Sequence, residues 1–191
     1  MLEQEARGAR PASCRSSETV WVNVRPRTPA DLPALIEVLR RVHDADGYPT
    51  VWPDDVSGWV VGDSGYGAWV AVIDDNVVGH VGLARPGLQA STQVWVATTQ
   101  RPVEWLVEVT RLFASPATRG FGVGHRLLQQ AVAGAHELGL WPVLDVRHEG
   151  RPGASRLYEA AGWRMVGGAP RRLESEVILP FDCWVGPPPP T

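Results

Sequence analysis

The sequence contains no lysine: all 18 of its basic residues are arginine, against 21 acidic residues, and the formal net charge is -3. Without lysine, Schiff-base chemistry and a P-loop phosphate site are excluded, because both use a lysine amine. Without an excess of basic residues, a dedicated nucleic-acid-binding protein or a polybasic membrane anchor is disfavoured. We therefore expect neither nucleic acid nor a membrane among the partners.

Cysteine is scarce and long apolar runs are missing. Cys14 and Cys183 stand near opposite ends of the chain, so they form neither a disulfide framework nor a zinc motif, and a reducing compartment is expected. No apolar stretch approaches the length that crosses a bilayer, and residues 1–7 lack the apolar core of a secretory signal. These absences predict a cytoplasmic protein without a metal site.

The hydrophobic content of 44% excludes a disordered chain and, at 191 residues, fits one domain. We expect a disordered polar leader at residues 1–18, a single α/β domain at 19–185 and a proline-rich tail at 186–191. Helical spacing predicts helices at 28–43, 122–138 and 154–161. Alternating or β-rich patterns predict strands at 20–24, 66–73, 77–83, 106–114, 141–146, 163–166 and 177–184. Residues 85–101 show little regular pattern. The order indicates a mixed sheet with helices on both faces.

A glycine-rich turn leads from the strand at 106–114 into the strongest helix. Gly120, Gly122 and Gly124 alternate there, and glycine lets backbone amides converge without obstruction by a Cβ atom. The unpaired amides and positive dipole of the helix N-terminus favour an anion such as a pyrophosphate, and Arg119 adds a positive charge. The alternative is a tight turn that binds nothing.

The dinucleotide-binding fingerprint is a second interpretation of this turn. It requires G-x-G-x-x-G and an acidic residue about 20 positions later. Asp145 mimics the acidic residue, but His125 stands where the third glycine belongs. An NAD(P)-dependent oxidoreductase is therefore the weaker alternative.

Three segments together resemble the GCN5-related N-acetyltransferase (GNAT) superfamily. Residues 119–124 (RGFGVG) fit its acetyl-CoA signature, Arg/Gln-x-x-Gly-x-Gly/Ala; residues 108–116 look like its fourth strand; and residues 154–163 (ASRLYEAAGW) look like its second motif. The order of elements agrees from about residue 20 to 184. The resemblance implies a GNAT fold, a mixed, mostly antiparallel sheet of six or seven strands with helices on both faces, and acetyl-CoA as co-substrate.

The resemblance also implies which residues bind the cofactor. In this family the fourth strand carries a bulge, and pantetheine pairs with its main chain. The matching positions here are Leu112 and Ala114, with Phe113 between them. The turn would bind the diphosphate through Arg119, Gly120, Phe121, Gly122, Val123, Gly124 and His125. One departure is Arg151, which stands where many members carry a cofactor-contacting asparagine.

The same resemblance assigns catalytic roles. Glu108 occupies the position of a glutamate base in some members, and Tyr158 matches the general-acid tyrosine. Strand alternation predicts that Glu108, Thr110, Leu112 and Ala114 share one face. The alternatives are a salt-bridged or solvent-facing glutamate and a tyrosine that only packs in the core.

Acceptor specificity in this family usually lies in the loop after the first helix, which here carries Tyr48 and Trp52. His80 is an alternative base or substrate contact, although a lone histidine in an apolar hairpin is typically a core residue. Nine tryptophans predict a pocket partly walled by indole.

We expect an N-acetyltransferase that moves an acetyl group to a primary amine of a small molecule, amino acid or peptide. A non-catalytic acyl-CoA-binding module stays open as an alternative. The expected assembly is a monomer or a homodimer.

Overall fold

The computed structural model describes residues 21–62, 65–148, 152–173 and 177–190, so the predicted leader, Cys14 and Arg151 lie outside the described residues. One seven-stranded sheet has the order β1-β2-β3-β4-β5-β7-β6, and β4 and β5 are its one parallel pair. The predicted mixed, mostly antiparallel sheet is confirmed. Its strands are β1 (Asn23–Pro26), β2 (Gly67–Ile73), β3 (Asn76–Ala84), β4 (Leu106–Ala114), β5 (Trp141–Arg147), β6 (Arg164–Arg172) and β7 (Ile178–Val185).

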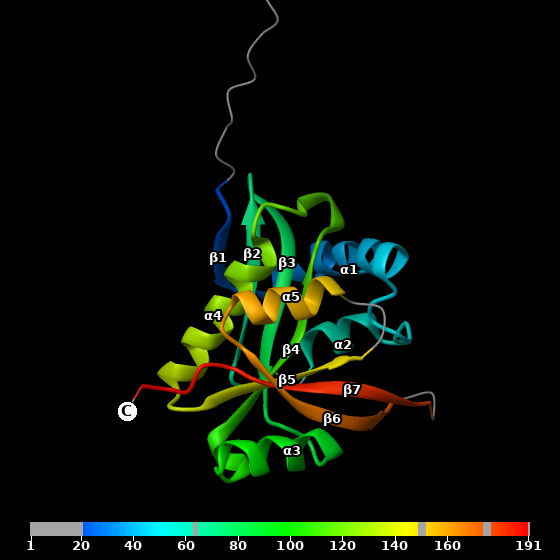
Figure 1. The fold of residues 1–191 in the computed structure, drawn as a ribbon. Helices are drawn as coiled ribbons and strands as arrows, with labels where there is room; N and C mark the ends of the chain where they lie inside the picture. Colours follow the sequence, from blue (N-terminus) through cyan, green and yellow to red (C-terminus); the bar gives the residue numbers. More distant parts are fainter. Residues whose placement is uncertain (1–20, 63–64, 149–151, 174–176, 191) are drawn as a thin grey trace, which may run out of the picture.

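Helices cover both faces of the sheet, as expected (Figure 1). They are α1 (Leu32–Asp46), α2 (Val56–Val61), α3 (Ala90–Thr99), α4 (Val123–Glu137) and α5 (Pro152–Ala160). Neighbouring strand residues point to opposite faces. Ala71 and Val107 pack with α4 and α5, whereas Val70 packs with α1 and α2, and Leu106 packs with α3. The sheet therefore separates α4 and α5 from the other three helices.

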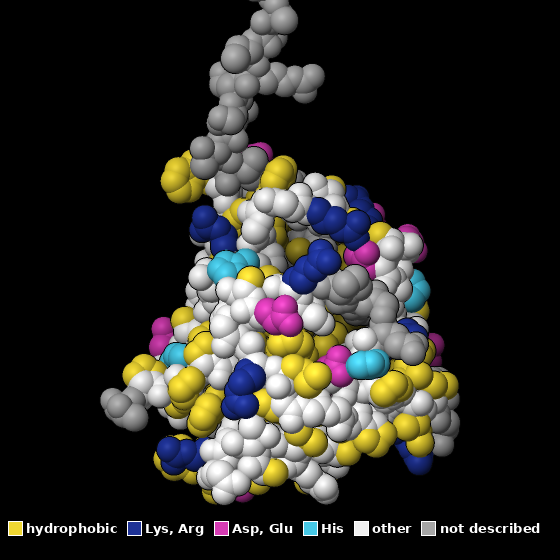
Figure 2. All heavy atoms as spheres, in the orientation of Figure 1, with side chains coloured by type: hydrophobic (Ala, Val, Ile, Leu, Met, Phe, Trp, Pro, Cys, Tyr) yellow, Lys and Arg dark blue, Asp and Glu magenta, His cyan; other side chains and the backbone are white. Residues whose placement is uncertain are grey.

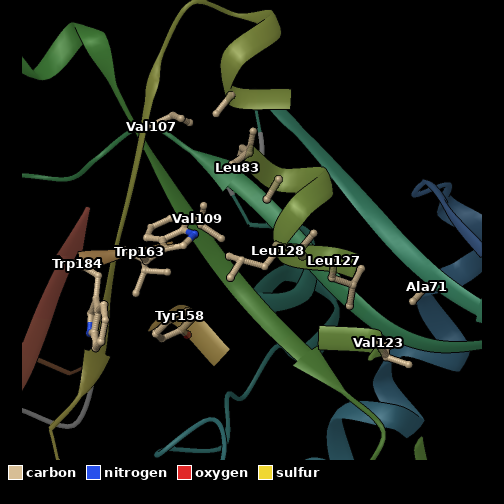
Figure 3. Close-up of a cluster of buried hydrophobic side chains, with 14 of the residues drawn as sticks. Ala71, Leu83, Val107, Val109, Val123, Leu127, Leu128, Tyr158, Trp163 and Trp184 are labelled. Carbon is tan, nitrogen blue, oxygen red and sulfur yellow. The ribbon is translucent and has the colours of Figure 1, made fainter. Parts of the chain in front are cut away.

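The largest core cluster lies between α4 and the sheet. Leu127, Leu128 and Ala131 are fully buried on one side of α4, which follows from apolar residues at helical spacing. Figure 3 shows Leu128 close to Val109 and Leu127 beside it, with Trp163 and Trp184 on the side of the cluster away from Leu127. This packing fixes the N-terminus of α4 at the end of β4, where the glycine turn lies.

Three segments differ from the predicted secondary structure. The strand predicted at 20–24 corresponds to β1, at Asn23–Pro26. Residues 85–101 contain α3, whose buried side includes Ser91, Thr92 and Thr99 beside Trp95, so no apolar stripe marks it in the sequence. The predicted strand at 163–166 continues to Arg172 as β6. Gly167, Gly168 and Pro170 interrupt the strand pattern, and they are tolerated because β6 is an edge strand.

The carboxyl end of the chain follows β7 without joining the sheet. Gly186 donates to the Pro142 carbonyl at 2.9 Å, and its own carbonyl accepts from the Trp141 indole at 2.8 Å. The start of the tail is thus held against β5. Among the described helices, none is both long and apolar enough to span a membrane.

Candidate active site

A cleft opens where β4 and β5 separate. Their parallel pairing runs from Leu106–Trp141 to Glu108–Val143 and ends there. The cleft beyond has a volume of about 390 Å³ and is lined from both sides of the sheet. Tyr48 and Trp59 line it on the α1–α2 side, and Tyr158 lines it from α5. The site therefore passes through the sheet rather than lying on one face.

A β-bulge in β4 shapes this cleft, as the family resemblance implies. Arg111 has φ +52°, and the register with β3 shifts between the His80–Phe113 and Gly82–Thr110 pairs. The extra residue reverses the alternation of side chains beyond it. Leu112 and Ala114 pack in the cluster under α4, whereas Glu108 reaches the α3 side. The expectation that Glu108, Leu112 and Ala114 share one face is wrong for this reason.

At the end of β4, the main chain of Ala114 faces the gap beside β5. The Ser115 amide donates to the Val78 carbonyl on β3 at 2.7 Å. Hydrogen-bonded and non-bonded pairs alternate along antiparallel strands, so Phe113 also pairs with β3. Ala114, between them, turns its amide and carbonyl to the opposite side. An extended ligand in the gap would find these groups available for pairing.

Glu108 lies buried in a polar cluster at the cleft, with 5% of its surface exposed. Its Oε2 accepts from the Gln89 amide at 3.0 Å, and its Oε1 lies 3.4 Å from Arg171. Arg171 also pairs with Asp145, which accepts from the Ser91 hydroxyl at 2.6 Å. No local pattern in the sequence predicts that Gln89, Ser91, Asp145 and Arg171 gather around Glu108.

The electrostatics of this cluster favour an additional positive charge. Burial raises the pKa of Glu108 above its usual range, the Arg171 guanidinium opposes that shift, and the neighbouring Asp145 adds to it. Burial also raises the pKa of the adjacent Cys183 thiol to about 11, so it stays neutral near neutral pH. Two carboxylates thus share one guanidinium. The two carboxylates exceed the one guanidinium, so the cluster carries a negative excess. This excess is confined to the cluster, because three further arginines, Arg111, Arg147 and Arg172, line the cleft.

Tyr158 lies on the other face of the sheet from Glu108. Its side chain, 7% exposed, packs against Trp184 and Trp163 with ring centroids 5.4 and 6.1 Å away (Figure 3). It also lines the cleft. The structure thus brings a carboxylate and a phenol to opposite sides of one opening.

Two of the three alternating glycines, Gly120 and Gly122, have the backbone freedom that the sequence predicts, whereas Gly124 lies inside α4 and a Cβ atom there would lie 3.3 Å from Leu157. Gly120 and Gly122 have φ of +86° and +74°, and a Cβ atom at either position would meet no protein atom within 4 Å. Gly122 is the N-cap of α4, and Arg126 donates the first bond of the helix back to it. The amides of Val123, Gly124 and His125 therefore belong to the first turn, which lacks intrahelical acceptors. Close approach of an anion to this backbone is unobstructed.

Arg119, expected at the anion, pairs with Asp46 at the end of α1. Its side chain is 65% exposed. The face formed by α4 and α5 carries basic and acidic side chains interspersed with apolar and neutral surface (Figure 2). The positive character of the turn comes from the backbone amides and single side chains rather than from one broad basic patch.

The three predicted acceptor contacts fall in different places. Tyr48 lines the cleft and packs edge-on against Trp59, at 5.8 Å between ring centroids. Trp52 packs on His43 at 5.1 Å, in the cluster beneath α1 and α2. His80 is fully buried beside Phe113. The indole at the cleft belongs to Trp59, on a helix of six residues that is too short to give a periodic signal.

A family model for acetyltransferases of the GNAT family matches residues 32–163, from the first residue of α1 to the end of the second motif. The chain belongs to the GNAT family. The match includes the bulged strand, the glycine turn and Tyr158. No curated protein sequence matches this GNAT chain significantly.

Solved structures confirm the GNAT fold. A protein assigned as a phosphinothricin N-acetyltransferase is 21% identical, with a TM-score of 0.65, covering 89% of this chain and 100% of its own. YncA from Salmonella typhimurium, assigned as an acetyltransferase and solved with its cofactor acetyl-CoA, is 16% identical, with a TM-score of 0.61 and coverages of 86% and 92%. The ribosomal-protein-S18-alanine N-acetyltransferase from Escherichia coli is 15% identical, with a TM-score of 0.63 and coverages of 90% and 96%.

Metal ligands do not gather in the described part of the chain: no three His, Cys, Asp or Glu side chains there are placed to hold an ion. The residues at the cleft instead offer a carboxylate, a phenol and backbone amides. These groups are suited to proton transfer and to binding an anion.

Proposed function

We propose that the protein is an N-acetyltransferase that moves the acetyl group of acetyl-CoA to the primary amine of a small molecule, an amino acid or a peptide. One observation carries the proposal. The cleft between β4 and β5 has a buried carboxylate on one face, a tyrosine on the other and an amide-lined helix N-terminus at the end of the bulged strand. Amine, thioester and diphosphate each have a chemically suitable partner there.

The cofactor lies along β4 in this proposal. The diphosphate accepts from the amides of Val123, Gly124 and His125, where the helix dipole adds to the attraction. The pantetheine extends along the free side of β4 and pairs with the main chain of Ala114, as an added strand would. This places the thioester beside Leu112, where the sheet is open.

The acceptor amine enters from the α1–α2 side, past Tyr48 and Trp59. An alkyl ammonium with a pKa of about 10 is protonated at neutral pH, and losing that proton costs roughly 4 kcal/mol. The negative excess of the Glu108 cluster favours the ammonium form on entry. Glu108 then accepts the proton, directly or through one water, because each carboxylate oxygen keeps a second lone pair.

The leaving thiolate departs on the Tyr158 side. A phenol can donate its proton to a thiolate as the carbon–sulfur bond breaks. Because Tyr158 and Glu108 lie on opposite faces, one group accepts a proton from the amine while the other donates a proton to the sulfur. The two roles need no shared path.

Tyr158→Phe should lower kcat by about 10²-fold, the low end of general-acid contributions, because a thiolate is already a good leaving group. The KM for acetyl-CoA should change little, since the ring still packs on Trp184. Thiol release with acetyl-CoA measures both constants. Tyr66→Phe is the matched control, since Tyr66 packs against the same core cluster but does not line the cleft. If Tyr158→Phe keeps full kcat, the tyrosine is not the acid.

Changing the charged neighbours of Glu108 should move the acid limb of the kcat/KM profile in opposite directions. Arg171→Gln should shift it to higher pH, because the guanidinium lowers the Glu108 pKa and the base acts only when ionised. Asp145→Asn should shift it to lower pH, because its carboxylate raises that pKa. Rate measurements against pH with both variants test this, and shifts of the same sign would contradict it.

A thiol-release assay with acetyl-CoA across a panel of amines tests the proposed function, with mass spectrometry of the acetylated product. An acyl-CoA-binding module would bind the cofactor and release thiol with none of them. The names of two structural relatives refer to different acceptors, phosphinothricin and an alanine of ribosomal protein S18, so the panel should include amino acids, simple amines and peptides. The site of action is expected to be the cytoplasm.

A further inference from the structure

His80 contacts the bulge of β4 with a tautomer that its partners fix. Arg27 Nη1 lies 3.1 Å from His80 Nε2, and His80 Nδ1 lies 3.0 Å from the Arg111 carbonyl oxygen. A guanidinium can only donate, so Nε2 must accept; a carbonyl can only accept, so Nδ1 must carry the proton. The ring is therefore the neutral Nδ1–H form.

Burial is the main reason that His80 stays neutral. It lowers the pKa of His80 to about 4; the bond to the Arg111 carbonyl opposes that shift, and the cations of Arg27 and Arg111 add to it. The imidazole ring of His80 stacks on the ring of Phe113, with 5.4 Å between the centroids. Protonation of the ring would add a proton at Nε2 and leave the Nδ1–H donor in place, so the bond to the bulge does not titrate near neutral pH.

The bond matters because of where the next amide points. Arg111 has φ +52°, a left-handed conformation that non-glycine residues rarely adopt. In a trans peptide the carbonyl and the following amide point in opposite directions. With the Arg111 carbonyl held by His80, the Leu112 amide is directed away from β3, to the side where β4 borders the cleft.

We propose that His80 is a positioning residue that holds the Arg111 peptide so that the Leu112 amide donates to the thioester carbonyl and to the oxyanion formed from it. The inference rests on the proposed function. Nitrogen attack converts the carbonyl carbon to a tetrahedral centre, and the oxygen gains the negative charge that this amide stabilises. His80 itself touches neither substrate nor cofactor.

Two amide substitutions separate the two contacts of His80. In His80→Asn the side-chain amide nitrogen lies near the position of Nδ1 and can still donate to the Arg111 carbonyl. In His80→Gln the amide lies near the position of Nε2 and keeps only the contact with Arg27. We expect His80→Gln to lower kcat by about 10²-fold, the cost of losing one oxyanion donor, and His80→Asn to retain most of kcat. Equal losses in both variants at matched melting temperatures would overturn the proposal.

Binding of two cofactor analogues supplies a readout that needs no acceptor. Acetyl-CoA has a thioester carbonyl, and S-ethyl-CoA has a CH₂ group in its place. The ratio of their Kd values therefore measures the hydrogen bond from the Leu112 amide to the carbonyl oxygen. The wild type and His80→Asn should bind acetyl-CoA about fivefold more tightly than S-ethyl-CoA, which is the value of one neutral hydrogen bond. His80→Gln should bind the two analogues equally well. If His80→Gln keeps the preference, the inference is wrong even where the acetyltransferase assignment stands.

The wild-type protein gives a third measurement should the variants fail to fold. In ¹⁵N NMR spectra the Leu112 amide should shift downfield on addition of acetyl-CoA but not of S-ethyl-CoA. Identical shifts with both would overturn the inference. Absence of thiol release with any amine, together with a normal Leu112 response, would instead count against the proposed function alone.

Discussion

Glu108→Gln should reduce kcat by about 10²- to 10⁴-fold, the range of a general base, and leave acetyl-CoA affinity within a few-fold of the wild type. Glutamine has the same shape but cannot take the proton of an ammonium. It also removes one of the two carboxylates that balance Arg171, so the site no longer carries a local negative excess. Thiol release at saturating acetyl-CoA, with calorimetric binding of the cofactor, separates the two effects.

Glu104 provides the control for this experiment. Glu104 lies four residues earlier, in the exposed turn before β4, and its carboxylate is an alternative candidate for the base. Glu104→Gln should leave kcat unchanged. If kcat falls in Glu104→Gln instead, or if Glu108→Gln is fully active at every pH tested, then Glu108 has only a structural role and another group accepts the proton.

Gly122→Val should abolish the thermal stabilisation that coenzyme A gives to the wild type. Gly122 has φ +74° at the N-cap of α4, and a β-branched residue in this left-handed region is strained. A side chain there would also obstruct the approach of a diphosphate to the first helical amides. Since a ligand at 100 times its Kd stabilises by about 2.7 kcal/mol, the loss is readily measured by melting temperature.

Gly139→Val separates strain from binding. Gly139 has φ +69°, follows the C-terminal end of the same helix and, like Gly122, has no protein atom within 4 Å of a Cβ position. Both variants should lose similar intrinsic stability. Only Gly122→Val should fail to respond to coenzyme A; a full response from it would remove the glycine turn from the cofactor site.

Local patterns predicted the elements that position the cofactor. The apolar stripe of α4, the glycines before it and the β-rich run of β4 all carry their information within a few residues, and the structure confirms each element. The second motif likewise gave α5 and Tyr158. These segments are also the ones in which the family resemblance resides.

The surroundings of Glu108 could not be predicted in the same way. Gln89 lies in a segment without helical or strand periodicity. Arg171 lies in the part of β6 where glycines and a proline interrupt the strand pattern. The two residues meet at Glu108 through tertiary packing alone. The bulge at Arg111 reverses side-chain alternation within one strand, which a period-of-two rule cannot detect.

A crystal structure of the protein with acetyl-CoA tests the central claim most directly. The account predicts the diphosphate on the amides of Val123, Gly124 and His125, with the thioester between β4 and β5 and its carbonyl oxygen within hydrogen-bond distance of the Leu112 amide. Density for the cofactor outside this opening, with the turn and the Leu112 amide uncontacted, would contradict it.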